Sequence, residues 1–153
     1  MYLTCSYSPD WFCVPLRKEG YTLGLITHIG KKGMLFGYFF KPKLKECPKY
    51  VPKDICKEQY ILRGKFGDKG LQDRKWHIIE VSNTIKMDDW PMSPMIRVDK
   101  SANIAFLSHY DNITLDFLFE EKCSPDLIDQ YPYDRLMGYG AVEIRLSNLV
   151  ESR

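Results

Sequence analysis

The 153-residue sequence lacks the features that assign many chains to a class at once. No run approaches 18 consecutive apolar residues, so the sequence predicts no transmembrane helix and no membrane partner. Its first ten residues contain neither a basic segment nor the apolar stretch of a secretory signal peptide, and we expect a cytoplasmic protein. The Gly-Lys-Ser/Thr phosphate motif and the Gly-x-Ser-x-Gly nucleophile motif are also missing. The sequence therefore offers no catalytic residues.

Histidines are few, and their spacing does not suit a metal ion. The three of them, His28, His77 and His109, are far apart and have no clustered carboxylates around them. Metal sites typically bring ligands together at short, regular spacings or from several adjacent elements. We interpret these side chains as strand histidines, and we expect neither a metal nor a cofactor.

Cysteines are odd in number and loosely spaced. The sequence has five, Cys5, Cys13, Cys47, Cys56 and Cys123, and no Cys-x-x-Cys pair. This spacing fits neither a zinc site nor a compact disulfide framework. We expect free thiols of the kind kept reduced in a cytosol.

Strand-forming residues are abundant, since aromatic side chains make up 14% of the chain. Runs of aromatic, β-branched and alternating residues predict nine strands, at 11–15, 21–29, 34–40, 60–63, 76–81, 95–99, 102–110, 112–119 and 141–146. No repeat or linker divides the chain, so residues 1–153 form one domain. The sequence predicts a mainly β fold, α+β at most: an antiparallel barrel or sandwich of about eight or nine short strands with one or two short helices.

Proline, glycine and serine residues indicate the structure of several segments between and within the predicted strands. The proline-containing stretch 41–57 predicts a surface excursion with one helical turn after Pro52, and 64–70 predicts a glycine-rich loop. Ser124 followed by Pro125 predicts the start of a short helix. Gly24 and Gly37 lie inside strands, which indicates a bulge or a close backbone approach. Trp76 and Trp90 are expected to be buried.

Charge is nearly balanced overall, at +2, but unevenly distributed. Residues 31–75 contain 13 Lys/Arg against 5 Asp/Glu, whereas residues 111–134 contain 7 Asp/Glu against one Lys. Such blocks indicate either charged partners or ordinary solvated surfaces, and the sequence leaves both readings open. Glu143, in an otherwise apolar run, is expected to be buried and ion-paired, with Arg145 as one candidate partner.

Lysines interleaved with aromatic residues between 41 and 75 suggest an alternative function, a nucleic-acid-binding module. No recognised nucleic-acid-binding motif accompanies them. The isoelectric point of about 8.2 also lies below the range typical of such domains. These two observations argue against a nucleic-acid partner.

A series of landmarks in order along the chain resembles the immunity-protein-26 family of bacterial toxin–immunity systems. They are Trp11–Leu16, Gly20–Gly24, Gly37–Phe40, Leu71 with Trp76–Ile79, Trp90–Met92 and Gly138–Ile144. The resemblance implies a small cytosolic protein, encoded beside a secreted toxin, that binds this toxin and so protects the producing cell. It supplies no catalytic residues, and because this sequence has no set of residues that suits catalysis, we expect no enzymatic activity.

If the chain binds a toxin, the acidic block is the predicted contact. Many toxins that act inside cells are nucleases with basic clefts, and an acidic surface would be attracted to one. Phe117, Phe119 and the tyrosines of the block would supply aromatic anchors. We predict a one-to-one complex with a cognate toxin through Asp111, Asp116, Glu120, Glu121, Asp126, Asp129, Tyr131, Tyr133 and Asp134.

Overall fold

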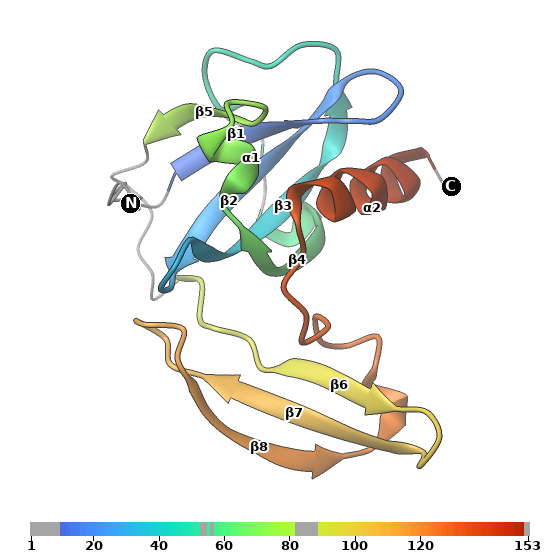
Figure 1. The fold of residues 1–153 in the computed structure, drawn as a ribbon. Helices are drawn as coiled ribbons and strands as arrows, with labels where there is room; N and C mark the ends of the chain where they lie inside the picture. The colour runs from blue at the N-terminus through green and yellow to red at the C-terminus, as the bar shows by residue number, and fades with distance from the viewer. Residues whose placement is uncertain (1–9, 53–54, 56, 82–88, 152–153) are drawn as a thin grey trace.

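The computed structural model describes residues 10–52, 55, 57–81 and 89–151 (Figure 1). Five of its strands form one antiparallel sheet in the order β4-β3-β2-β1-β5. β1 and β2 pair as a hairpin, as do β2 and β3, and each of these pairs is joined by a short glycine-containing turn. The strands are β1 (Asp10–Pro15), β2 (Tyr21–Ile29), β3 (Met34–Leu44), β4 (Tyr60–Gly67) and β5 (His77–Val81).

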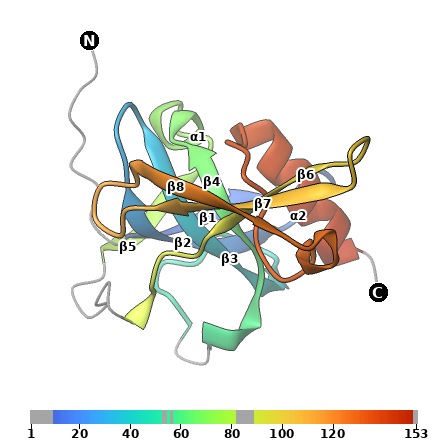
Figure 2. The same cartoon turned by 90° about the horizontal axis from the view of Figure 1, so that it is seen from below.

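The other three strands form a second antiparallel sheet, in the order β6-β7-β8. They are β6 (Met95–Asp99), β7 (Ile104–Tyr110) and β8 (Phe117–Cys123). This sheet lies below the larger one in Figure 1 and in front of it when the molecule is seen from below (Figure 2). The mainly β prediction is confirmed. Neither sheet closes on itself, so the structure is not a barrel.

The last predicted strand, at 141–146, is wrong, because this segment lies in the helix α2 (Tyr139–Glu151). Residues 141–146 alternate between apolar and polar, as a strand would. Val142, Leu146 and Val150, however, recur every fourth residue, and these are side chains that the helix packs into the core. Over six residues the two periods cannot be told apart.

Other helical segments are short. They are the turn Lys57–Gln59, the helix α1 (Lys69–Gln72) and the turn Pro125–Leu127. Ser124 caps the last of these through its hydroxyl, which accepts from the Asp126 amide, as the sequence predicted.

Several predicted segment boundaries were wrong. The strand β3 continues into the proline-containing stretch as far as Leu44, and β4 occupies half of the predicted loop at 64–70. The strand predicted at 112–119 begins only at Phe117. Asp111 accepts hydrogen bonds from the amides of Ile113 and Thr114 and so holds the preceding residues in a turn.

The core divides between the two faces of the larger sheet. Along β3, Leu35 and Phe39 point to one face, where they pack with Trp76 and α2. Phe36, Tyr38 and Phe40 point to the other, where they meet Trp90 and Met95 at the start of β6. One face of the larger sheet thus packs against α2, and the other packs against Trp90, Met95 and Leu115, which flank or belong to the three-stranded sheet. Both predicted tryptophans are buried.

Gly24 and Gly37 mark close approaches, as expected. A Cβ atom on Gly24 would collide with the ring of Phe12, and one on Gly37 would collide with the carbonyl oxygen of Leu25. The absence of a side chain lets neighbouring strands and the Phe12 ring occupy this space.

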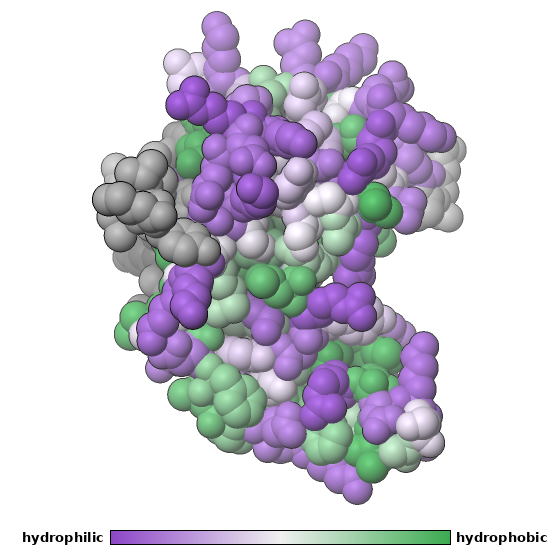
Figure 3. Space-filling view, viewed as in Figure 1, coloured by the Kyte–Doolittle hydropathy of each residue, from purple (hydrophilic) through white to green (hydrophobic). Residues whose placement is uncertain are grey.

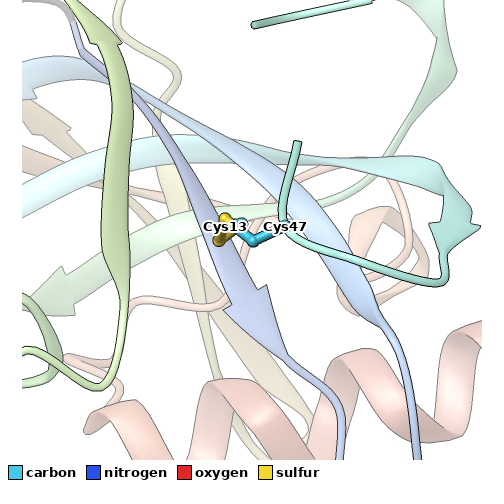
Figure 4. The surroundings of a disulfide bond; sticks show 2 residues. All are labelled: Cys13 and Cys47. Carbon is cyan, nitrogen blue, oxygen red and sulfur yellow. A yellow bond between two sulfur atoms is a disulfide. The ribbon is translucent and has the colours of Figure 1, made fainter. Parts of the chain in front are cut away.

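The expectation of free thiols throughout is wrong, because Cys13 and Cys47 form a disulfide (Figure 4). The chain turns back after β3 and brings Cys47 beside β1. The 34-residue separation gives no sequence signal for this pairing, which depends on the sheet topology. Cys123 is a free thiol, and Cys5 and Cys56 lie outside the described residues.

Reduction of this disulfide is expected to lower the free energy of unfolding by about 2–4 kcal/mol, because the bond closes a long loop in the unfolded chain. Urea titrations with and without a reductant measure the difference. A Cys47→Ala variant is the control, since its stability should not respond to reductant. Equal stability of the oxidised and reduced wild type would contradict the prediction.

Candidate functional site

The strand β8 forms one edge of the three-stranded sheet and is exposed along nearly its whole length. Its first three side chains are all apolar, and each is more than half exposed: Phe117 at 56%, Leu118 at 55% and Phe119 at 52%. Hydrophobic surface is visible over this sheet in the lower part of Figure 3. Consecutive exposed apolar residues of this kind are typical of interaction surfaces.

Two of the three exposed side chains are held in place by neighbouring rings. The Phe119 ring stacks on the His109 imidazole, with centroids 4.4 Å apart and planes within 12°. Phe117 meets Tyr110 edge to face at 5.9 Å. A partner that bound these rings would therefore lose less side-chain entropy than with freely rotating ones.

Glu120 and Glu121 follow in the same strand, and as adjacent strand residues they lie on opposite faces. Glu120 accepts a hydrogen bond from Arg97 at 3.2 Å. Glu121 lies 3.6 Å from the His109 ring nitrogen Nε2, which is beyond hydrogen-bond distance. Both carboxylates are on the surface, and both have a cationic or titratable neighbour.

Asp111 and Asp116 lie at the two ends of the turn that joins β7 to β8. The hydrogen bonds from the Thr114 and Ile113 amides lower the pKa of Asp111. Asp116 lies 3.6 Å from the Lys31 ammonium of the β2–β3 turn. Asp111 therefore has a structural role in this turn, and Asp116 pairs with a cation from the other sheet.

The remaining predicted contacts are divided between surface and core. Asp126 and Asp129 are exposed in and after the short turn at 125–127, and the described residues offer them no ion pair. Tyr131 is half-buried against Ile96, whereas Tyr133 is exposed, with the Arg145 guanidinium 5.5 Å from its ring centre.

Asp134 does not belong to the exposed surface. Its carboxylate accepts hydrogen bonds from the Lys65 ammonium at 2.9 Å and from the Tyr110 hydroxyl, and it ties β4 to β7. Burial would raise the pKa of Asp134, but these two hydrogen bonds outweigh burial and hold the pKa below its ordinary value. We therefore interpret Asp134 as a structural residue.

This assignment predicts a pH-dependent loss of stability in an Asp134→Asn variant. A carboxylate with a lowered pKa stabilises the fold above its unfolded-state value, and this contribution disappears as the pH falls through the folded-state pKa. We expect the variant to be less stable by about 1.5–3 kcal/mol at pH 7, the value of a hydrogen bond to a charged group. Urea titrations should show the gap closing in acid. The exposed Asp126→Asn variant is the control, and identical pH profiles for Asp134→Asn and the wild type would refute the assignment.

Arginines from other parts of the chain adjoin the acidic block. A cavity of about 210 Å³ lies between β4, residues 128–133 and α2, and its lining includes Arg63 and Arg145. Arg63 donates to the Gln130 carbonyl oxygen, and its guanidinium lies 5.4 Å from the centre of the Tyr60 ring. The surface around the block therefore has both signs of charge, which the count along the sequence did not reveal.

Leu118 is an exposed member of this surface that the sequence did not indicate. In a half-buried strand, every second residue lies on an inner face. An edge strand with both faces exposed breaks this rule, and the signal for it was the charged run Glu120–Lys122 directly after the apolar residues.

His28 and Glu143 make contacts that stabilise the fold. His28 is buried and hydrogen-bonds to the Asn112 side chain; burial lowers its pKa more than this bond raises it. Glu143 accepts from the Trp76 indole at 2.9 Å and lies 3.6 Å from Arg17, so its ion-pair partner is Arg17 and not Arg145. No grouping of metal-binding side chains occurs in the described part of the chain.

The family model for Immunity protein 26 matches residues 10–106. The chain belongs to the Immunity protein 26 family. Comparisons with curated proteins and with solved structures give no match. The matched residues include all of the larger sheet and reach into β7, so β8 lies beyond them. Among the described helices none is long and apolar enough to cross a membrane.

Proposed function

We propose that this Immunity protein 26 member binds and neutralises a cognate toxin as a one-to-one complex in the cytoplasm of the producing cell. The observation that carries the proposal is the family match over residues 10–106. A stoichiometric inhibitor needs a rigid scaffold and an exposed contact surface but no reactive groups. The two-sheet core and the exposed strand β8 fit this requirement.

The contact surface in this proposal consists of β8 and the turn that follows it. Phe117, Leu118 and Phe119 provide apolar area, and Glu120, Glu121, Asp126 and Asp129 provide exposed negative charge beside it. Interfaces commonly combine buried aromatic anchors with a charged rim that steers association. Asp134 and Asp111 are left out of the surface because they stabilise the fold.

Within this proposal the toxin is a nuclease. Its active-site cleft must attract phosphate and is therefore basic. The exposed carboxylates at and after β8 would be attracted to such a cleft, and apolar residues beside them would exclude water from the contact.

The alternative, a nucleic-acid-binding module at 41–75, receives less support from the structure. Lys43 forms salt bridges with Glu151 at 3.1 Å and with Glu19 at 3.6 Å. Lys65 forms a salt bridge with Asp134. Phe66 is fully buried in the core. Lys65 and Phe66 therefore do not belong to an exposed basic and aromatic surface.

The decisive experiment uses the toxin domain encoded beside the gene for this chain. The purified protein should abolish degradation of RNA or DNA by this domain at a one-to-one molar ratio, and light scattering should show a one-to-one complex. Lysozyme at the same concentration is the control. Undiminished toxicity and no complex would refute the proposal, and retention of the protein on heparin at physiological salt would favour the nucleic-acid alternative.

A further inference from the structure

The edges of the two sheets are covered to different extents. At the edge strand β4, the Gly67 amide donates to the Met137 carbonyl, and the Met137 amide donates to the Lys65 carbonyl. At the edge strand β6, the Ile96 amide donates to Pro132, and Asp134 donates back to Ile96. Residues 132–137 thus cover part of the main chain at both edges.

The outer edge of β8 has no such cover within the described residues. It is seven residues long, against five in β5, the remaining edge strand. Every second residue of an antiparallel edge strand points its amide and carbonyl groups away from its partner. Beyond the bulge at Leu118, β8 therefore presents an open ladder of donors and acceptors from Phe119 to Cys123, next to the exposed side chains of Phe117 and Leu118.

Natural edge strands usually carry protection against pairing, such as proline, lysine, a bulge or a very short length. In β8 a bulge lies at Leu118, because Phe117 pairs with Tyr110 and Phe119 with His109. From Phe119 to Cys123 the pairing with β7 is regular, and Lys122 is the one protective residue. Charge appears only from Glu120 onward, and two of the three charged residues, Glu120 and Glu121, are acidic. An edge that is apolar at one end and acidic at the other favours a partner strand with apolar residues at one end and cations at the other.

A second copy of the chain is a poor occupant of this edge. The antiparallel register that pairs the whole strand with itself places Glu120 opposite Glu120 and Glu121 opposite Phe119. Like charges directly opposite each other destabilise a sheet. A partner strand with apolar residues opposite 117–119 and cations opposite 120–121 would match both ends of β8.

We propose that a strand of the toxin adds to the outer edge of β8 and extends the three-stranded sheet, with apolar side chains opposite Phe117–Phe119 and Lys or Arg opposite Glu120 and Glu121. This inference rests on the proposed function and specifies its binding mode. Main-chain pairing supplies affinity in such complexes, and alternate side chains supply specificity. Phe119 is the apolar side chain of this edge that is best ordered before binding, because its ring stacks on His109.

Amide hydrogen exchange tests the pairing directly. The ¹⁵N-labelled protein is measured alone and with the catalytically inactivated toxin domain. Amides within 119–123 that exchange quickly in the free protein should slow by about tenfold or more in the complex, and they should alternate with amides already protected by β7. A complex in which these outward amides exchange at their free rates overturns the strand-pairing proposal and leaves the function intact, whereas absence of a complex counts against the function itself.

Proline scanning at Glu120 and Glu121, where the pairing with β7 is regular, gives a second test. One of these two adjacent amides points outward, so one proline variant keeps the β7 ladder and remains folded. This variant should weaken toxin binding by about 30-fold, equivalent to about 2 kcal/mol. The alanine variant at the same position is the matched control, because it keeps the amide. If the folded proline variant bound as tightly as its alanine control, main-chain pairing would be excluded.

Discussion

Replacing Trp76 with alanine is expected to remove about 3–5 kcal/mol of stability, the cost of deleting a large buried aromatic side chain. Trp76 is only 1% exposed and lies between the larger sheet and α2. Its ring stacks on Phe12 at 5.5 Å, and its indole donates to the Glu143 carboxylate at 2.9 Å. Truncation leaves a cavity and deprives a buried carboxylate of a donor, and the two costs add.

Urea and thermal unfolding measure this loss. A change of this size should lower the melting temperature by about 10 °C or more in a domain of this length. Trp76→Phe separates the two contributions, because it keeps most of the ring and removes only the donor, and a loss of about 1–3 kcal/mol is expected. Ile78→Ala, at an exposed site two residues along the chain, should stay within about 0.5 kcal/mol of the wild type. A Trp76→Ala protein that melted within a few degrees of the wild type would show that the ring is not a core element.

Much of the fold could be predicted from local residue type. The strands from Trp11 to Phe40 are long runs of aromatic and β-branched residues separated by glycine turns, and nothing in their surroundings conflicts with that preference. The strand β6 alternates apolar and polar residues and was placed to the residue. Where propensity, pattern and turn chemistry agree, a sequence specifies its local structure.

What escaped prediction depends on contacts that are distant in the sequence. The helix α2 was missed because six alternating residues fit a strand, and only its packing on Trp76 shows which period applies. The disulfide depends on the fold of the sheet that brings β1 beside the end of β3. For the site, the acidic block was visible, but the partners of its carboxylates were not: Lys65, Arg97 and Lys31 come from three other elements. A count of charge along the chain cannot separate Asp134, which is structural, from Asp126, which is exposed.

Reversing the charge of Glu120, Glu121 and Asp126 to lysine is expected to weaken toxin binding by at least about 100-fold. Close charge pairs across an interface couple by roughly 1.5–7 kcal/mol each, so the loss of two such pairs suffices. A basic cleft would attract the wild-type surface and repel the variant, so association should slow as well as dissociation quicken. Stopped-flow and equilibrium binding with the inactivated toxin domain measure both rates.

Because Glu120 pairs with Arg97 at the surface, its reversal should cost the fold itself only about 0–1 kcal/mol. Unfolding curves check this, so that a loss of binding is not mistaken for a loss of structure.

The matched control reverses Lys41, Lys45 and Lys49 to glutamate. These three are exposed and belong to the basic stretch, and Lys43 is avoided because it bridges Glu19 and Glu151. The control should bind nearly as well as the wild type, and with a faster association if the cleft is basic. If the lysine set instead produced the larger loss, the toxin contact would lie on the five-stranded sheet, and both the β8 surface and the basic cleft would be wrong.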